Sequence, residues 1–253
     1  MSTDVPRALT SVASASSPSA KAAISTAAPD SHLLTVGLGF TAGFVDTLAF
    51  VALFSFFAAH VTGNFVVLGS ALGQPVHGLI AKLLALPLFI VAVAAARLYG
   101  RSLERRGRAA ATPLLTLEAL FLILFMALGV FSAPITNADA PIAILTALSS
   151  TVAMGIQNAA SRTVFASLSP TTVMTGNVTQ LVIDGVDLIA GGPEATLNPV
   201  RARFKRFWPA VLAFAIGAAC GALCYKHAGF LSLLLPTVLV VALAVHSRVR
   251  AHR

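Results

Sequence analysis

A polar tripeptide, Thr-Gly-Asn, occurs twice in this chain between apolar segments. The two copies are Thr62-Gly63-Asn64 and Thr175-Gly176-Asn177. A glycine-led polar group precedes each copy by 16 or 17 residues, with Asp46 before the first and Gln157 and Asn158 before the second. Because two matched polar sets lie in apolar surroundings, we interpret them as one structural unit that is written twice.

These residues could bind a solute at the beginning of a helix. Threonine and asparagine are good N-cap residues, and glycine lets a ligand or a second backbone approach closely. Helices that begin at Thr62 and Thr175 would point unpaired N–H groups and positive dipole ends into the protein, toward an anion or a carbonyl group. The alternative is that each motif only ends one helix and begins another. The candidate solute-binding residues are Thr62, Gly63, Asn64, Thr175, Gly176, Asn177, Gln157 and Asn158.

Asp46 is the candidate proton-coupling residue. It lies halfway along the apolar stretch 33–58, and an aspartate at the centre of a membrane helix costs about 2.5–3.5 kcal/mol on insertion scales. Such a side chain is kept neutral, paired or used, so a proton-coupled transporter could use Asp46 as the carrier. The alternative is a structural hydrogen bond to broken backbone near Thr62 or Thr175. His60 could titrate near neutral pH, although an interfacial hydrogen bond is the simpler interpretation.

The composition indicates a membrane protein. Of the 253 residues, 57% are hydrophobic and 10% are charged, with a mean hydropathy of +0.87, whereas soluble domains carry about 25% charged residues. The net charge of +8 would suggest nucleic acid for a soluble protein, but 12 of the 17 basic residues lie in three clusters beside apolar segments. This placement follows the positive-inside rule, so we expect the lipid bilayer, and no nucleic acid, as a partner. The clusters are Arg97–Arg108, Arg201–Arg206 and Arg248–Arg253.

Six stretches are long enough to cross a bilayer, which takes about 20 apolar residues. They predict an all-α, polytopic transmembrane bundle that forms a single domain over residues 31–253. Residues 1–30 lack the continuous apolar core of a secretory signal, so we expect a disordered cytoplasmic tail or a misassigned start of translation. The predicted spans are 33–58, 80–99, 113–133, 141–165, 207–225 and 229–247.

Two further apolar stretches, 62–74 and 172–190, follow the motifs and are predicted to re-enter the membrane. If 172–190 crossed fully, the cluster Arg201–Arg206 would lie on the outer side, against the positive-inside rule. Re-entry instead puts every basic cluster and both termini in the cytoplasm. The halves 33–133 and 141–247 then each have three spans and one re-entrant segment in opposite orientation, an inverted repeat of the kind found in secondary transporters.

Other acidic residues are expected to have simpler roles. Asp184 and Asp187 share a helical face and are expected to pair with Arg162 or with the cluster Arg201–Arg206; the alternative is a role in transport. Glu118, in the first turns of its span, is expected to snorkel or to pair near the surface.

Three Gly-x-x-x-Gly pairs predict close contacts between helices. These contacts could lie within one chain or between chains, which leaves a homo-oligomer open. Cys220 and Cys224 lie four residues apart among Gly and Ala, a pattern of packing residues rather than of a disulfide or zinc site. The glycine pairs are Gly39 with Gly43, Gly69 with Gly73, and Gly217 with Gly221.

The double motif is similar to that of the YoaK-like family of bacterial inner-membrane proteins (domain of unknown function 1275). The resemblance rests on a Gly-x-x-Asp group with Thr-Gly-Asn, followed by a Gly-x-Gln-Asn group with a second Thr-Gly-Asn. It covers about residues 33–246 and implies a polytopic inner-membrane protein, without implying a substrate.

Two functions are compatible with these features. The first is a small secondary transporter or exporter of a small polar or anionic solute, with proton coupling at Asp46. The second is a non-transporting scaffold or sensor that binds a lipid-like ligand or a protein partner; a channel is a weaker third. We expect no enzyme, cofactor or metal site, because the sequence has no phosphate-binding loop, no His-Glu-x-x-His and no Gly-x-Ser-x-Gly.

Overall fold

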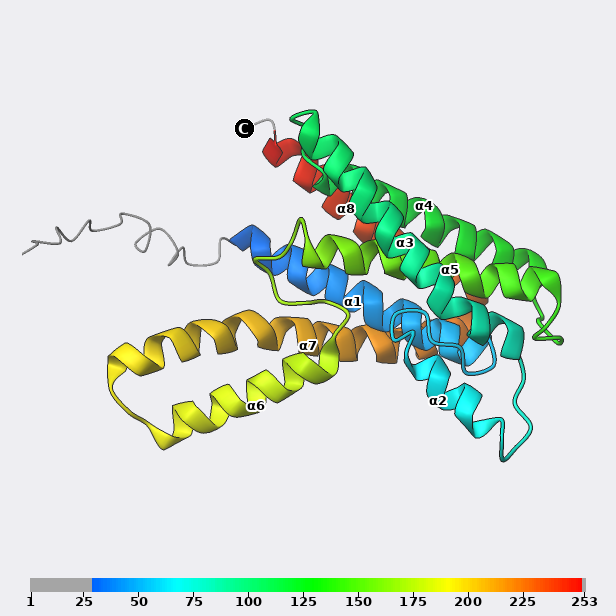
Figure 1. Cartoon of the computed structure of the whole chain (residues 1–253), viewed down its shortest axis with the longest axis horizontal. Helices are drawn as coiled ribbons and strands as arrows, with labels where there is room; N and C mark the ends of the chain where they lie inside the picture. The colour runs from blue at the N-terminus through cyan, green and yellow to red at the C-terminus, as the bar shows by residue number, and fades with distance from the viewer. Residues whose placement is uncertain (1–28, 252–253) are drawn as a thin grey trace, which may run out of the picture.

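The computed structural model describes residues 29–251 and is helical throughout this range, apart from the connecting segments (Figure 1). The prediction of an all-α fold is therefore confirmed. Of the predicted tail, residues 1–28 lie outside the described residues, and the last two begin the first helix. The elements are α1 (Pro29–Ala52), α2 (Gly63–Ser70), α3 (Leu79–Arg105), α4 (Ala111–Ser132), α5 (Pro141–Arg162), α6 (Met174–Ala190), α7 (Glu194–Ala228), the 3-10 helix η1 (Gly229–Leu233) and α8 (Leu234–Ala251).

Five segments among the described residues are long and apolar enough to cross a membrane. The last of them contains α7, η1 and α8, and the chain reverses its direction at η1 (Figure 1), so it covers two of the six predicted spans. Large apolar side chains within these segments, such as Leu83, Val91 and Leu223, are exposed on the outside, where lipid would cover them. The segments are His32–Ala52, Leu79–Arg105, Ala111–Ser132, Pro141–Arg162 and Glu194–Val249.

Two predicted helix boundaries are wrong. α1 ends at Ala52 rather than at residue 58, because Phe54 and Ser55 have φ values of 54° and 62° and turn the chain back. Positive φ is uncommon for residues other than glycine. α7 begins at Glu194 rather than near residue 207, so the cluster Arg201–Arg206 belongs to a helix of 35 residues.

α1 and α7 pack closely because glycines on each helix face the backbone of the other. A Cβ atom on Gly43 would lie 2.1 Å from the carbonyl oxygen of Phe214, and one on Gly217 would lie 2.1 Å from that of Phe40. Two of the three glycine pairs therefore make the predicted contact, and they do so within one chain. The pair in and after α2 does not: a Cβ on Gly69 would meet no atom of another element within 4 Å, and one on Gly73 would meet only the nearby carbonyl oxygen of Ser70 at 3.9 Å.

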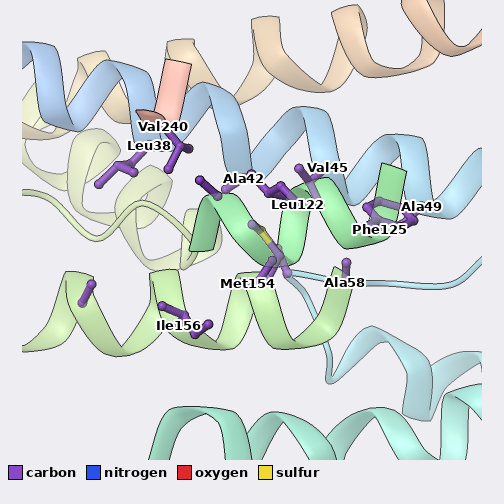
Figure 2. Packing of buried hydrophobic residues seen from close by; sticks show 14 of the residues in the cluster. Leu38, Ala42, Val45, Ala49, Ala58, Leu122, Phe125, Met154, Ile156 and Val240 are labelled. Atoms are coloured by element: carbon purple, nitrogen blue, oxygen red, sulfur yellow. The ribbon is translucent and has the colours of Figure 1, made fainter. Parts of the chain in front are cut away.

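The apolar core lies between α1, α4, α5 and α8 (Figure 2). Leu38 and Val45 of α1, Leu122 of α4, Met154 of α5 and Val240 of α8 are all fully buried there. α7 covers α1, and α3 covers α5. The short helix α2 packs on α3, while α6 and the first half of α7 form a hairpin that projects from the bundle (Figure 1).

Candidate functional site

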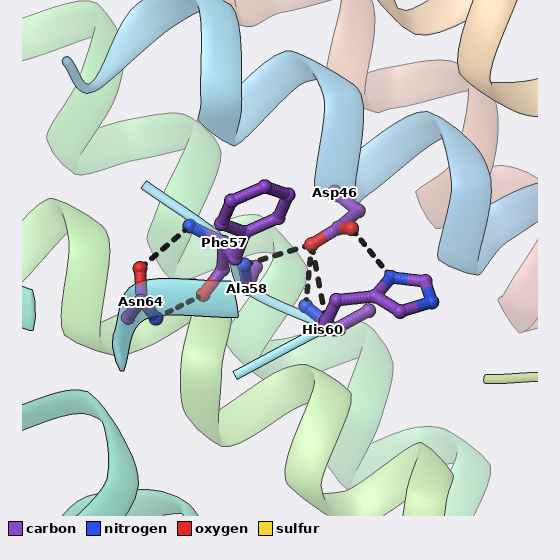
Figure 3. A network of polar contacts seen from close by, with 6 residues as sticks. Asp46, Phe57, Ala58, His60 and Asn64 are labelled. Atoms are coloured by element: carbon purple, nitrogen blue, oxygen red, sulfur yellow. Dashed lines mark hydrogen bonds and ion pairs between the residues drawn. The ribbon is translucent and has the colours of Figure 1, made fainter. Parts of the chain in front are cut away.

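Asp46 holds the segment that folds back after α1 (Figure 3). Its Oδ1 accepts hydrogen bonds from the amides of Ala58, Ala59 and His60 at 2.9, 2.7 and 3.3 Å. Its Oδ2 lies 2.7 Å from Nδ1 of His60, and the residue is only 5% exposed. Backbone amides that have left the helix thus find a charged acceptor, and such hydrogen bonds are strong. Asp46 therefore has the structural role that the sequence offered as an alternative, and it also forms a titratable pair with His60.

His60 is the titratable partner of Asp46 and lies outside the five candidate spans. Its hydrogen bond to Asp46 raises the pKa of His60 above the ordinary value, although burial opposes this shift. The side chain is 32% exposed, so the surrounding helices do not enclose it. The ring also meets Phe214 of α7 edge-on, with 5.3 Å between the centroids. His60 thus connects the returning segment to both α1 and α7.

The asparagines of the two motifs make equivalent contacts. Nδ2 of Asn64 donates to the carbonyl oxygen of Phe57 at 2.9 Å, and its Oδ1 accepts from the amide of Phe57 at 3.0 Å (Figure 3). Nδ2 of Asn177 donates to the carbonyl oxygen of Pro170 at 2.6 Å. Each partner stands seven residues before its asparagine, and proline has no amide N–H for a second bond. Both asparagines are buried, so each one closes its returning segment from the inside.

The other motif residues lie differently from the asparagines. Thr62 and Thr175 are exposed, and Thr62 makes no side-chain cap hydrogen bond to the described residues. A Cβ on Gly63 would lie 2.8 Å from the ring of Phe57, whereas Gly176 is exposed and has room around it. In each motif, the asparagine is therefore the side chain that the structure places in the interior.

The beginnings of α2 and α6 correct part of the prediction. α2 begins directly after Thr62, but the amides of residues 63–65 donate to the carbonyl groups of residues 60–62 at 2.7 to 3.1 Å. The expectation of unpaired amides at the start of this helix is wrong, because the preceding turn already supplies acceptors. α6 begins at Met174, one residue before Thr175.

Gln157 holds the second returning segment much as Asp46 holds the first. Its Nε2 donates to the hydroxyl of Thr171 at 3.0 Å and to the carbonyl oxygen of Leu38 at 2.7 Å. Gln157 is fully buried, and its Oε1 has no hydrogen-bond partner within the described part of the chain. Asn158 is half-buried beside it. An acceptor without a donor in the interior is a place where a polar solute could bind.

Asp184 pairs with a member of the cluster Arg201–Arg206, as predicted. Nε of Arg203 lies 2.9 and 3.0 Å from its two carboxylate oxygens, and Nε2 of Gln180 donates to Oδ1 at 2.8 Å. Burial raises the pKa of Asp184, but the hydrogen bonds from Arg203 and Gln180 outweigh it and leave the pKa below its usual value. Asp187 is exposed on the same helix. The pair joins α6 to α7, which favours a structural role.

The prediction for Glu118 is wrong. The side chain does not reach the surface: it is 0% exposed, and neither carboxyl oxygen has a hydrogen-bond partner among residues 29–251. Glu118 lies on the buried face of α4 with Leu114, Leu115 and Leu122. Snorkelling requires the polar end to reach water along the helix surface, and this face of α4 is covered.

Lys82 is a buried polar residue that the sequence reasoning missed. It is 1% exposed, and its Nζ donates to the carbonyl oxygens of Phe54 and His77 at 2.8 and 2.7 Å. Lys82 thus attaches α3 to the turn that ends α1. The available signal was a lysine within the apolar stretch 80–99.

No group of three or more His, Cys, Asp or Glu side chains that could hold a metal ion occurs in the part of the chain that the structure describes.

An all-helical body with five candidate spans, an apolar exterior and polar breaks inside defines a multi-pass membrane protein. The chain belongs to the family described as "Protein of unknown function (DUF1275)", whose model matches residues 34–246, and this confirms the resemblance found in the sequence. It is 35% identical to the UPF0700 transmembrane protein YoaK of Bacillus subtilis (strain 168) over 161 residues, which are 63% of this chain and 69% of that relative. No solved structure matches the chain.

Proposed function

We propose that the protein is a small secondary transporter of a small polar or anionic solute, built from two inverted repeats. The observation that carries this proposal is the pair of returning segments. Each is held by a buried polar side chain of the helix before it and closed by the asparagine of the motif. Irregular backbone at membrane depth is tolerated where it is buried in protein or lines a cavity, and secondary transporters place their binding sites at such breaks.

Helix packing supports the inverted repeat. If α1 to α4 correspond in order to α5 to α8, the contact of α1 with α7 corresponds to that of α5 with α3. The contact of α1 with α8 likewise corresponds to that of α5 with α4. Equivalent glycines lie at the first of these contacts: Gly43 meets α7, and a Cβ on Gly155 would lie 2.9 Å from the Cβ of Ala92 in α3. Corresponding long helices also run in opposite directions (Figure 1).

The proposed location is the bacterial inner membrane, with both termini in the cytoplasm. The connection between α3 and α4, the end of α8 and the hairpin of α6 and α7 all lie at the end of the molecule away from α2 (Figure 1). These three places carry the basic clusters, which under the positive-inside rule supports a cytoplasmic location for that end.

Single-cysteine labelling tests this orientation. In a chain with Cys220 and Cys224 replaced by serine, cysteines at Gln74 and Thr136 are expected to react with a membrane-impermeant maleimide in intact cells. A cysteine at Thr196 is expected to react only after the cells are opened. All three positions are exposed in the structure. Labelling of position 196 from outside would mean that α6 crosses the membrane, and the inverted repeat would be abandoned.

The proposed solute-binding region lies at the motifs and Gln157, and the proposed proton-coupling residue is Asp46 together with His60. Protonation of Asp46 would weaken the acceptor for three amides, and loss of the proton from His60 would remove the ion pair. Either change loosens the segment that leads directly into α2 at Gly63. A change in the protonation of Asp46 or His60 would thus change how firmly α2, the proposed re-entrant helix, is held in place.

Proteoliposome flux tests the function. A dye for internal pH reports proton movement when phosphate, chloride, nitrate, acetate, small amino acids or polyols are added across a pH gradient. We expect at least one solute class to move protons with the wild-type protein, and Asp46→Asn to abolish this response while the protein stays folded. An exposed matched variant, Asp139→Asn, is expected to retain flux. No response to any of these solutes would contradict the transport proposal, and equal flux in Asp46→Asn would remove Asp46 from the coupling.

A groove favours the second candidate function, a sensor that binds a lipid-like ligand. It has a volume of about 1020 Å³ and lies between the end of α3, the beginning of α4 and the end of α8. Arg108 and Arg248 supply positive charge, while Leu117 and Leu120 supply apolar surface. That combination suits an anionic lipid, since basic pockets between helices on the cytoplasmic side bind lipid head groups. Failure of every solute in the flux experiment would favour this function.

A further inference from the structure

We propose that Glu118 is a proton-binding site inside the helix bundle, separate from Asp46 and His60, and that it exchanges its proton with the cytoplasmic side. Glu118 is the eighth residue of α4, about 10 Å along the helix, at a rise of 1.5 Å per residue, from the end that is cytoplasmic in the proposed orientation. This site does not depend on solute transport, because proton binding can be measured with no solute present.

The environment of Glu118 requires a neutral carboxyl group at rest. The side chain is 0% exposed, and both oxygens are without a hydrogen-bond partner among the described residues. Leu114, Leu115 and Leu122, which share its face of α4, are each at most 1% exposed. A buried carboxylate persists only if it is paired, and otherwise it takes up a proton. The three other buried charged residues in the described range, Asp46, Lys82 and Asp184, all have partners.

No cation described on α5, η1 or α8 pairs with Glu118. α3 also approaches α4 near Gly100, but its Arg97 is paired with Glu104 and its Arg101 is exposed. α5 and α8 supply the main contacts of α4, and η1 adds a smaller one. The ionisable side chains described on these elements are Arg162 on α5 and His246 and Arg248 on α8, and all three lie at the cytoplasmic ends of their helices. None of them forms an ion pair with Glu118 in the described structure. A proton is therefore the ligand that these surroundings can accept.

A short route for the proton leads from the groove at the cytoplasmic end. The groove reaches Thr116 and Leu117, the two residues directly before Glu118, and it is also lined by Thr112 and Pro113. Water in the groove can thus approach α4 within one helical turn of Glu118, while the covered face keeps bulk water from the carboxyl group.

Infrared spectroscopy of the protein in lipid bilayers tests the protonation state. The wild-type protein is expected to show the carbonyl band of a protonated carboxylic acid at neutral pH, and Glu118→Gln is expected to lose this band completely. Asp46→Asn is the matched control and is expected to keep it. The band should decrease reversibly as the pH is raised. Its absence at neutral pH, or its failure to respond to pH over the range in which the protein stays folded, would overturn the proposal.

Labelling with dicyclohexylcarbodiimide gives a second measurement, because this apolar reagent adds to protonated carboxyl groups in membranes. Mass spectrometry is expected to find the adduct on the peptide that contains Glu118, with less adduct at higher pH and none in Glu118→Gln. The exposed Glu104 is the internal control and should stay unmodified. If sodium ions at constant pH protected Glu118 from the reagent, the ligand of this site would be a metal cation instead of a proton. Labelling only after denaturation would show that protons do not reach the site.

Discussion

Replacing Gly217 with alanine is expected to lower the free energy of unfolding by about 3 kcal/mol, at the upper end for overpacking in a well-packed interior. The added Cβ would lie 2.1 Å from the carbonyl oxygen of Phe40 and 2.9 Å from its carbonyl carbon. Both are backbone atoms of a helix, so no side chain can rotate away. α1 and α7 would have to separate, which would loosen the core around Leu38 and Val45.

Thermal melting of the purified protein in detergent measures this effect, with Gly69→Ala as the matched control. Gly69 lies in α2, where a Cβ would meet no described atom within 4 Å. Alanine is also more favourable than glycine within a helix by about 1 kcal/mol. The control is therefore expected to melt at or slightly above the wild-type temperature. A Gly217→Ala protein that melts like the control would show that α1 and α7 are further apart than the structure places them.

The spans and the glycine contacts could be predicted because they depend on local patterns. Apolar length identifies a span whatever its neighbours are, and Gly217 with Gly221 presents a smooth helix face before any partner is known. The pairing of Asp184 was predictable for a related reason. A carboxylate in an apolar helix needs a cation, and the cluster Arg201–Arg206 is the nearest supply along the chain.

The end of α1 could not be predicted, because no glycine, proline or asparagine marks the place where the helix breaks. Phe54 and Ser55 lie in the left-handed region, and nothing in their side chains demands it. The break is stabilised from elsewhere: Lys82 binds the carbonyl oxygen of Phe54 from 28 residues away, and Asp46 binds the amides that follow. Contacts of this kind appear only once the helices are placed in space.

The burial of Glu118 was missed for the same reason. Its distance from the helix end permits snorkelling in a single helix, and only the packing of α5 and α8 on α4 removes that option.

For the candidate site, the motifs and Asp46 could be identified from the sequence, but the sequence did not indicate which motif residues point into the interior. The structure separates the buried asparagines from the exposed threonines, which have the same spacing in the sequence.

Replacing Asp46 with alanine is expected to have the second large effect, a loss of about 3 kcal/mol or more in the free energy of unfolding. The amides of Ala58 and Ala59 are buried and would lose their acceptor, and each buried donor left unsatisfied costs about 1–3 kcal/mol. Asp46→Asn is the matched variant. Its side-chain oxygen can still accept from these amides, so it is expected to lose only about 1 kcal/mol.

Asp46→Asn also separates the structural role of Asp46 from the pH dependence of its contact with His60. The contact with Asp46 raises the pKa of His60, so the protonated ring binds more strongly in the folded protein than in the unfolded chain. That stabilisation is complete below the ordinary histidine pKa of about 6.5 and is lost as the pH rises through the higher folded value. The wild-type melting temperature should therefore decrease over this interval, and the decrease should be absent in Asp46→Asn. An equal decrease in both proteins would assign the pH dependence to another group and leave Asp46 with the structural role alone.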